Sequence, residues 1–78
     1  MADRFALDVQ IGSRLASRRE ALGLSQSDLA EVLGCKQPHV SRVEGGAVSL
    51  SLRGLERWCA ALGCSVAIVI APAVEVAA

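Results

Sequence analysis

Polar residues that can make specific hydrogen bonds gather in one short stretch, K-Q-P-H-V-S-R-V-E, from Lys36 to Glu44. Its spacing predicts a short helix on which Val40 and Val43 face inward. The residues opposite these valines, or at the exposed amino end of the helix, are Lys36, Gln37, Pro38, Ser41 and Arg42. Amide, hydroxyl and guanidinium groups in this arrangement can form hydrogen bonds with base edges in a DNA major groove.

The sequence shows no group of residues with the composition of a catalytic or metal site. It has no serine–histidine–aspartate set, no paired carboxylates, no phosphate-binding glycine loop and no metal-ligand spacing. The three cysteines are an odd number, which fits a reducing cytosol, and Cys59 is expected to be a buried core thiol. We therefore expect a protein that is not an enzyme and that uses no cofactor and no metal.

A second short helix and a glycine turn precede this helix and are expected to hold it in place. Ser25 is a favourable N-cap, and Leu29, Ala30 and Leu33 recur after it with helical spacing. Gly34 follows at the position where a helix end usually requires a left-handed residue. The stretch from residue 24 to residue 46 therefore predicts two helices joined by a turn.

Two further helices flank this pair. A helix over about residues 9–22 is capped by Asp8, and a helix over about residues 52–62 is capped by Ser51. Trp58 lies on the apolar face of the later helix, so we expect it to pack in the core rather than to stack on a base.

The segment S-V-A-I-V-I-A, residues 65–71, is rich in β-branched residues and predicts a strand that ends at Pro72. No second strand is predicted that could satisfy its backbone groups, and it lacks the alternation of a strand with one solvated face. We expect it to pair with the same strand of a second copy, through Val66, Ala67, Ile68, Val69 and Ile70. The chain then comprises an N-terminal arm (1–8), a helical domain (9–64), a dimerisation strand (65–71) and a flexible tail (72–78).

The charge balance weighs against indiscriminate binding to nucleic acid, because 8 basic and 8 acidic residues give a formal net charge of zero. The distribution is uneven, since residues 36–58 hold four basic residues and two acidic ones. The longest apolar run, residues 66–74, is too short to span a bilayer, and no signal peptide is apparent. We expect a cytoplasmic protein with no membrane partner.

The pattern of helices and turn resembles the helix-turn-helix of the Xre/Cro repressor family. The family pattern is G-L-[ST]-Q-x-x-L-A-x-x-[LIV]-G, followed by a polar-led helix that ends in E-x-G. The matching residues here are Gly23, Leu24, Ser25, Gln26, Leu29, Ala30, Gly34, Glu44 and Gly46. The resemblance implies an all-α, four-helix lambda-repressor-like DNA-binding domain, to which the sequence adds one C-terminal β-strand that pairs across a dimer.

The resemblance also implies a role for individual residues. Base contacts fall to the five exposed residues between Lys36 and Arg42 named above. Phosphate contacts fall to Gln26 and, in the loop and helix start that follow the reading helix, to Gly46, Ser51 and Arg53. The family also pairs Arg19 with Glu44, and a partly buried Glu44 would require such a partner.

Within the family, the G-x-K-Q opening at Gly34 to Gln37 and the single terminal strand resemble HipB-type antitoxins. This likeness implies a repressor that binds double-stranded DNA at a palindromic operator, a kinase-type toxin partner and autorepression of a shared operon. Two alternatives stay open: a stand-alone Xre-type regulator, and an interaction adaptor that has lost DNA binding. Zero net charge favours the adaptor, whereas the outward polar residues disfavour it.

Overall fold

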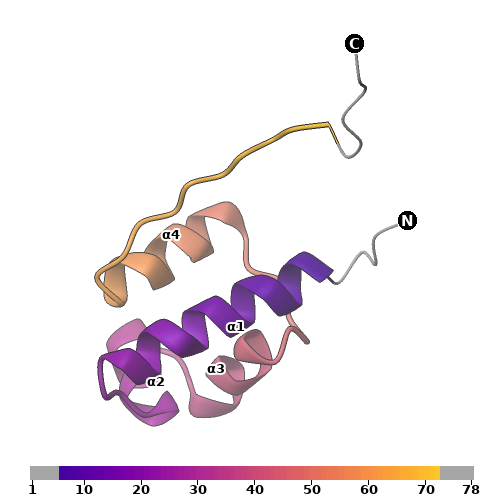
Figure 1. Ribbon diagram of the computed structural model, residues 1–78. Coiled ribbons are helices and arrows are strands. Elements are labelled where there is room, and N and C mark those ends of the chain that lie inside the picture. The colour runs from indigo at the N-terminus through magenta and orange to yellow at the C-terminus, as the bar shows by residue number, and fades with distance from the viewer. Residues whose placement is uncertain (1–5, 73–78) are drawn as a thin grey trace.

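Four α-helices follow one another along residues 6–72, the part of the chain that the computed structural model describes (Figure 1). They are α1 (Ala6–Ala21), α2 (Gln26–Leu33), α3 (Gln37–Glu44) and α4 (Leu52–Ala61). The short helix α3 packs against both α1 and α2, and α4 packs against α2. The expectation of an all-α, four-helix domain is therefore confirmed. None of the helices within these residues is both long and apolar enough to cross a lipid bilayer.

The start of α1 differs from the prediction. The helix begins at Ala6, so Asp8 lies in its first turn and is not its N-cap. An acidic residue is favourable there because the first turn carries the positive end of the helix dipole. The Asp8 carboxylate also accepts a hydrogen bond of 2.6 Å from the Ser49 hydroxyl, which joins α1 to the loop before α4. Residues 6–8 thus belong to the helix rather than to an arm, and the rest of that predicted arm, residues 1–5, lies outside the described residues.

The core forms where the apolar faces of the four helices meet. Val40 and Val43 turn inward from α3 with exposed fractions of 0% and 2%, as their spacing predicts. Trp58 is also buried, which confirms its role in the core, and its ring lies edge-on to that of His39 with the ring centres 6.2 Å apart. The other buried apolar residues are Leu15, Leu29, Ala30, Leu33, Leu55, Cys59 and Leu62.

Local signals set the ends of α2. The Ser25 hydroxyl accepts a 3.0 Å hydrogen bond from the Asp28 N–H, and the Asp28 carboxylate accepts one of 2.9 Å from the Ser25 N–H. This capping box lowers the pKa of Asp28, chiefly through the bond from the Ser25 backbone. Gly34 ends the helix in the left-handed conformation, with φ of 71°.

Two arginines cap the carboxyl ends of helices that are distant in sequence. Arg18 donates through Nε to the Leu62 carbonyl at the end of α4, at 2.9 Å, and Arg57 donates to the Leu33 carbonyl at the end of α2. A cation is favourable at a helix end with free carbonyl groups. Arg57 therefore stabilises the packing of α4 against α2. In the sequence it belongs, with Lys36 and Arg42, to the basic residues of the segment 36–58.

Gly12 lets α1 approach the backbone of α3. A Cβ atom at this position would lie 2.4 Å from the Val43 carbonyl oxygen and 2.6 Å from that of Glu44. Both are backbone atoms at the end of a helix, so they cannot move aside as a side chain would.

Gly12→Ala should therefore lower the free energy of unfolding by about 1–3 kcal/mol, as expected for overpacking. The sign of this change in stability is informative, because alanine in a helix interior otherwise stabilises a helix relative to glycine by up to about 1 kcal/mol. Chemical denaturation of Gly12→Ala, with the exposed α1 variant Ser13→Ala as control, measures the effect. A stability equal to or above that of the parent would show that α1 and α3 are not in close contact here.

The C-terminal segment, residues 64–72, leaves the end of α4 and runs back past that helix (Figure 1). It forms no regular secondary structure within the described residues, so the strand predicted over 65–71 is not formed in the single chain. A strand needs a neighbour for its backbone hydrogen bonds, and the rest of residues 6–72 is helix and turn. Val66 packs on the core, whereas Ile68, Val69 and Ile70 are 61%, 88% and 94% exposed. Of the predicted flexible tail, residues 73–78 lie outside the described residues.

Candidate nucleic-acid interface

The exposed surface of α3 carries the polar residues that the sequence assigns to base contacts. The helix begins with Gln37 and Pro38 in its first turn, and proline is tolerated there because the first N–H groups of a helix need no intrahelical partner. With Val40 and Val43 buried, the opposite side of the helix faces solvent. This exposed α3 surface consists of Lys36, Gln37, Pro38, Ser41 and Arg42.

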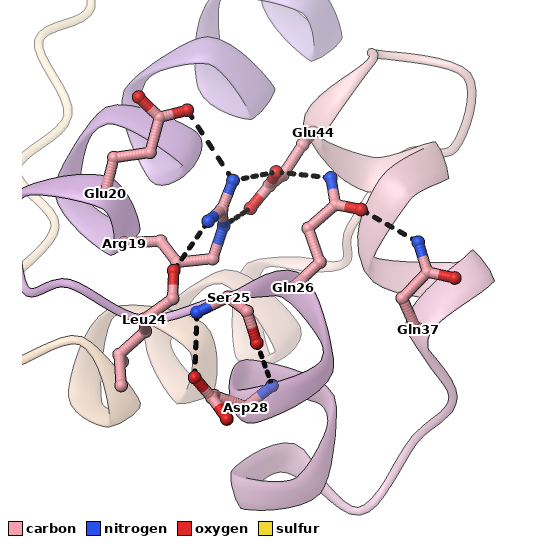
Figure 2. A network of polar contacts seen from close by, with 8 residues as sticks. All are labelled: Arg19, Glu20, Leu24, Ser25, Gln26, Asp28, Gln37 and Glu44. Atoms are coloured by element: carbon pink, nitrogen blue, oxygen red, sulfur yellow. Dashed lines mark hydrogen bonds and ion pairs between the residues drawn. The ribbon is translucent and has the colours of Figure 1, made fainter.

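A chain of hydrogen bonds runs from this surface into the domain, and we call it the polar network (Figure 2). Gln37 donates through Nε2 to the Oε1 of Gln26 at 2.8 Å. Gln26 in turn donates through Nε2 to the Oε1 of Glu44 at 2.9 Å. Glu44 accepts two further bonds from Arg19, from Nε at 2.7 Å and from Nη2 at 3.0 Å. The network thus links α1, α2 and both ends of α3.

The polar network has a single consistent direction. An ionised Glu44 carboxylate can only accept hydrogen bonds, so Gln26 must present its amide nitrogen to Glu44 and its carbonyl oxygen to Gln37. Gln37 must then donate with its own amide nitrogen. The Gln37 carbonyl oxygen and the second N–H of its amide do not take part in the network and are available to bind another molecule. The carboxylate therefore fixes the orientation of an amide on the exposed surface.

The ion pair at the inner end of the network is buried. The side chains of Arg19 and Glu44 are 11% and 6% exposed. Arg19 also donates through Nη1 to the Leu24 carbonyl at 2.7 Å, so its guanidinium is bonded on three sides. The hydrogen bond to Glu44 raises the pKa of Arg19, and the favourable charge interaction with Glu44 adds to this effect. The paired fork and carboxylate hold α1 against α3.

The structure corrects one of the residues predicted to contact phosphate. Gly46 is buried, and its N–H donates to the Val43 carbonyl at 3.1 Å, so this backbone group is already occupied. Its φ is +79°, and a Cβ atom there would lie 2.7 Å from the Val9 side chain. Glycine is therefore required at this position for the turn and for the contact with α1. We remove Gly46 from the candidate DNA contacts.

Two of the other three phosphate candidates are exposed. Ser51 caps α4 by accepting a 3.0 Å hydrogen bond from the Gly54 N–H, and it is exposed together with Arg53 in the first turn. Gln26 is half-buried because it belongs to the polar network. The polar network was not predicted from the sequence, because the sequence pattern indicated separate roles for Gln26 and Gln37. Among the residues that the structure describes, no three histidine, cysteine, aspartate or glutamate side chains gather to hold a metal ion.

Two short helices joined by a left-handed glycine, the second with an exposed polar face, are the arrangement of a helix-turn-helix domain. A family model described as a helix-turn-helix domain matches residues 10–68, and the chain belongs to this family.

Relatives of the chain agree with this assignment and with the resemblance to Xre/Cro regulators. The chain is 36% identical over 63 residues to an uncharacterized HTH-type transcriptional regulator of Haemophilus influenzae. That match covers 81% of this chain and 64% of the relative's length. The fold is also similar to the crystal structure of the restriction-modification controller protein C.AhdI from Aeromonas hydrophila, with a TM-score of 0.74 and 36% identity. That match covers 82% of this chain and 93% of the controller. The specific likeness to HipB-type antitoxins stays a prediction.

Proposed function

We propose that the chain is a homodimeric transcriptional repressor that binds a palindromic DNA operator through α3. The observation that carries this proposal is the polar network behind an exposed polar helix face. A helix that serves only packing or dimerisation has no need for a buried carboxylate that orients an exposed amide. Direct recognition of a base edge does need a side chain held in one orientation.

The free groups on Gln37 match one base in particular. One carbonyl oxygen and one N–H on the same amide can accept from N6 and donate to N7 of adenine. Arg42 and Lys36 carry only donors, and these suit the O6 and N7 acceptors of guanine. The Arg42 Nε lies 3.4 Å from the Pro38 carbonyl oxygen, so this side chain runs along the helix toward its amino end.

Local charge supports DNA binding despite the zero net charge. Lys36 and Arg42 are exposed on the α3 surface, whereas the acid of the same helix, Glu44, is buried and paired with Arg19. Gln26, Ser51 and Arg53 then serve as phosphate contacts on either side of the groove. The interface therefore presents positive charge to the duplex while the formal charges of the whole chain cancel.

Two roles are possible for such a repressor, and they differ in the regulated gene and in the protein partner. The HipB-type likeness favours an antitoxin that binds a kinase-type toxin and represses a shared operon. The restriction-modification controller among the relatives favours a regulator without a toxin. A dimeric repressor is compatible with either role for this chain. Co-purification with a kinase-like product of a neighbouring gene would support the antitoxin, and its absence would support the stand-alone regulator. The cytoplasm is the expected location for any of these regulators.

Selection from random double-stranded oligonucleotides, followed by a salt titration, tests the proposal against a non-DNA-binding adaptor. A repressor enriches a palindrome, and its affinity falls steeply with salt because bound phosphates release counterions. An adaptor enriches no motif. The absence of any enriched sequence at low salt would contradict the proposed function.

Gln37→Ala and Arg42→Ala should each weaken operator binding by about 1–3 kcal/mol and relax the preference at one base position per half-site. Titration of each variant against the selected operator and against single-base variants of it measures both effects. Arg14→Ala, which removes an exposed arginine from α1, is the matched control and should leave the base preference unchanged. Unaltered affinity and preference in both test variants would exclude α3 as the reading helix.

A further inference from the structure

Two of the three cysteines lie at the end of α4, where the C-terminal segment begins. Cys59 is buried, with an exposed fraction of 7%, and Cys64 is exposed. Both line the same cavity of about 370 Å³, which lies between α4 and the C-terminal segment. The proposed DNA-binding function uses neither thiol.

Backbone hydrogen bonds bring these two residues together. Gly63 has a φ of +65°, and its N–H donates to the Ala60 carbonyl at 3.2 Å. The Cys64 N–H donates to the Cys59 carbonyl at 2.9 Å. These two bonds define a Schellman motif, and a contact between the side chains of its first and last bonded residues frequently accompanies this motif. Here those residues are Cys59 and Cys64.

The two thiols differ in chemical character. Burial raises the pKa of the Cys59 thiol to about 11, and a hydrogen bond with the Cys64 side chain adds to the increase. Cys59 is therefore protonated at neutral pH and is covered by the core. Cys64 is the thiol that an oxidant in solution reaches first. An accessible thiol beside a second, resolving thiol is the arrangement that favours reversible oxidation.

We propose that Cys59 and Cys64 form a dithiol site that a peroxide converts into a reversible intrachain disulfide. In the first step the Cys64 thiolate attacks a peroxide oxygen, so that an S–O bond forms and the O–O bond breaks. The hydroxide or alkoxide that leaves takes up the proton that the Cys64 thiol released to solvent, and it departs as water or an alcohol. In the second step the Cys59 sulfur attacks the Cys64 sulfur, so that the S–S bond forms and the S–O bond breaks. The hydroxyl leaves with the Cys59 proton as water. Two thiols are oxidised and one peroxide is reduced.

The disulfide would tie the start of the C-terminal segment to α4. Cys64 precedes Val66 by two residues, and Val66 begins the part of the segment assigned to dimerisation. Because the backbone bond from Cys64 to Cys59 already places the two residues side by side, closure should require little change in the helices. This inference goes beyond the proposed function and does not depend on DNA binding.

Peptide mapping tests the proposal directly, because trypsin separates the cysteines. Cleavage after Arg19, Lys36 and Arg57 leaves Cys35 in peptide 20–36 and both other cysteines in peptide 58–78. The folded protein is treated with hydrogen peroxide, and the remaining thiols are alkylated after denaturation. Peptide 58–78 should then lose two hydrogen atoms and take up no alkylating reagent, while peptide 20–36 is alkylated. A dithiol reductant should reverse the change.

Two variants and one spectrum complete the experiment. The Cys35→Ser variant should form the same disulfide in peroxide. In the Cys64→Ser variant, whose substitution is at an exposed position, Cys59 should stay a thiol and be alkylated. The far-ultraviolet circular dichroism of the oxidised protein should match that of the reduced protein. The proposal is overturned if the disulfide forms elsewhere, as a crosslink to peptide 20–36 or as a covalent dimer. It is also overturned if no disulfide forms, because both thiols persist in peroxide or Cys64 is oxidised to sulfinic acid instead. Loss of helix on closure would overturn it as well.

Discussion

Glu44→Ala should lower the free energy of unfolding by about 3–5 kcal/mol, because it leaves the buried Arg19 guanidinium without its counter-charge. The two side chains are 11% and 6% exposed, so water cannot replace the missing partner readily. A surface pair would contribute about 1 kcal/mol or less. The same substitution also removes the acceptor that orients Gln26 and, through it, Gln37.

The control for this prediction is a second acid beside the same arginine. Glu20 lies 3.6 Å from Arg19 in the structure, but its side chain is 69% exposed. Glu20→Ala should therefore change the stability by about 1 kcal/mol or less. Thermal or chemical unfolding of Glu44→Ala, Arg19→Ala and the double variant completes the cycle. Simple additivity of the two single effects would show that the residues do not interact.

Truncation after Ser65 should convert the protein to a monomer and weaken binding to the full palindrome by roughly 10²–10⁴-fold. A closed twofold contact is self-complementary, so the segment Val66–Ala71 can satisfy its backbone groups against its own copy. Pairing of this kind would also bury the exposed side chains of Ile68, Val69 and Ile70. Much of the weak, sequence-independent affinity should survive, since the helix-turn-helix is intact.

Molar mass by light scattering tests the dimer without DNA. Ile68→Pro should give the same result as the truncation, because proline removes a backbone donor from the ladder. Ile68→Val keeps the β-branched character and should leave the dimer intact. If residues 1–65 remain dimeric, the interface lies on the helices instead. In the dimer, the two α3 helices should lie roughly 34–36 Å apart, or a multiple of this distance, to enter successive major grooves on one face of the duplex.

The helix-turn-helix itself was predictable because its signals are local. Ser25 and Asp28 cap α2 through bonds that span three residues, and Gly34 ends the helix through its own backbone conformation. The inward positions of Val40 and Val43 follow from helical periodicity alone. Such features depend on neighbours within a few residues, so the sequence is sufficient to infer them. The exposed α3 surface could be located for the same reason.

The remaining features depend on how the helices pack, and the sequence does not contain that information in any local form. The bond from Arg18 to the Leu62 carbonyl spans 44 residues, and the bond from Gln26 to Glu44 spans 18. Gly46 matches a family motif, yet only the folded structure shows that its N–H is bonded to the Val43 carbonyl and that it lies against Val9 of α1. Sequence alone determined which helices form and which face of α3 is polar. The tertiary structure decided which polar groups are paired, which glycines permit close contact and which amide is held ready at the surface, because each of these depends on atoms that only folding brings together.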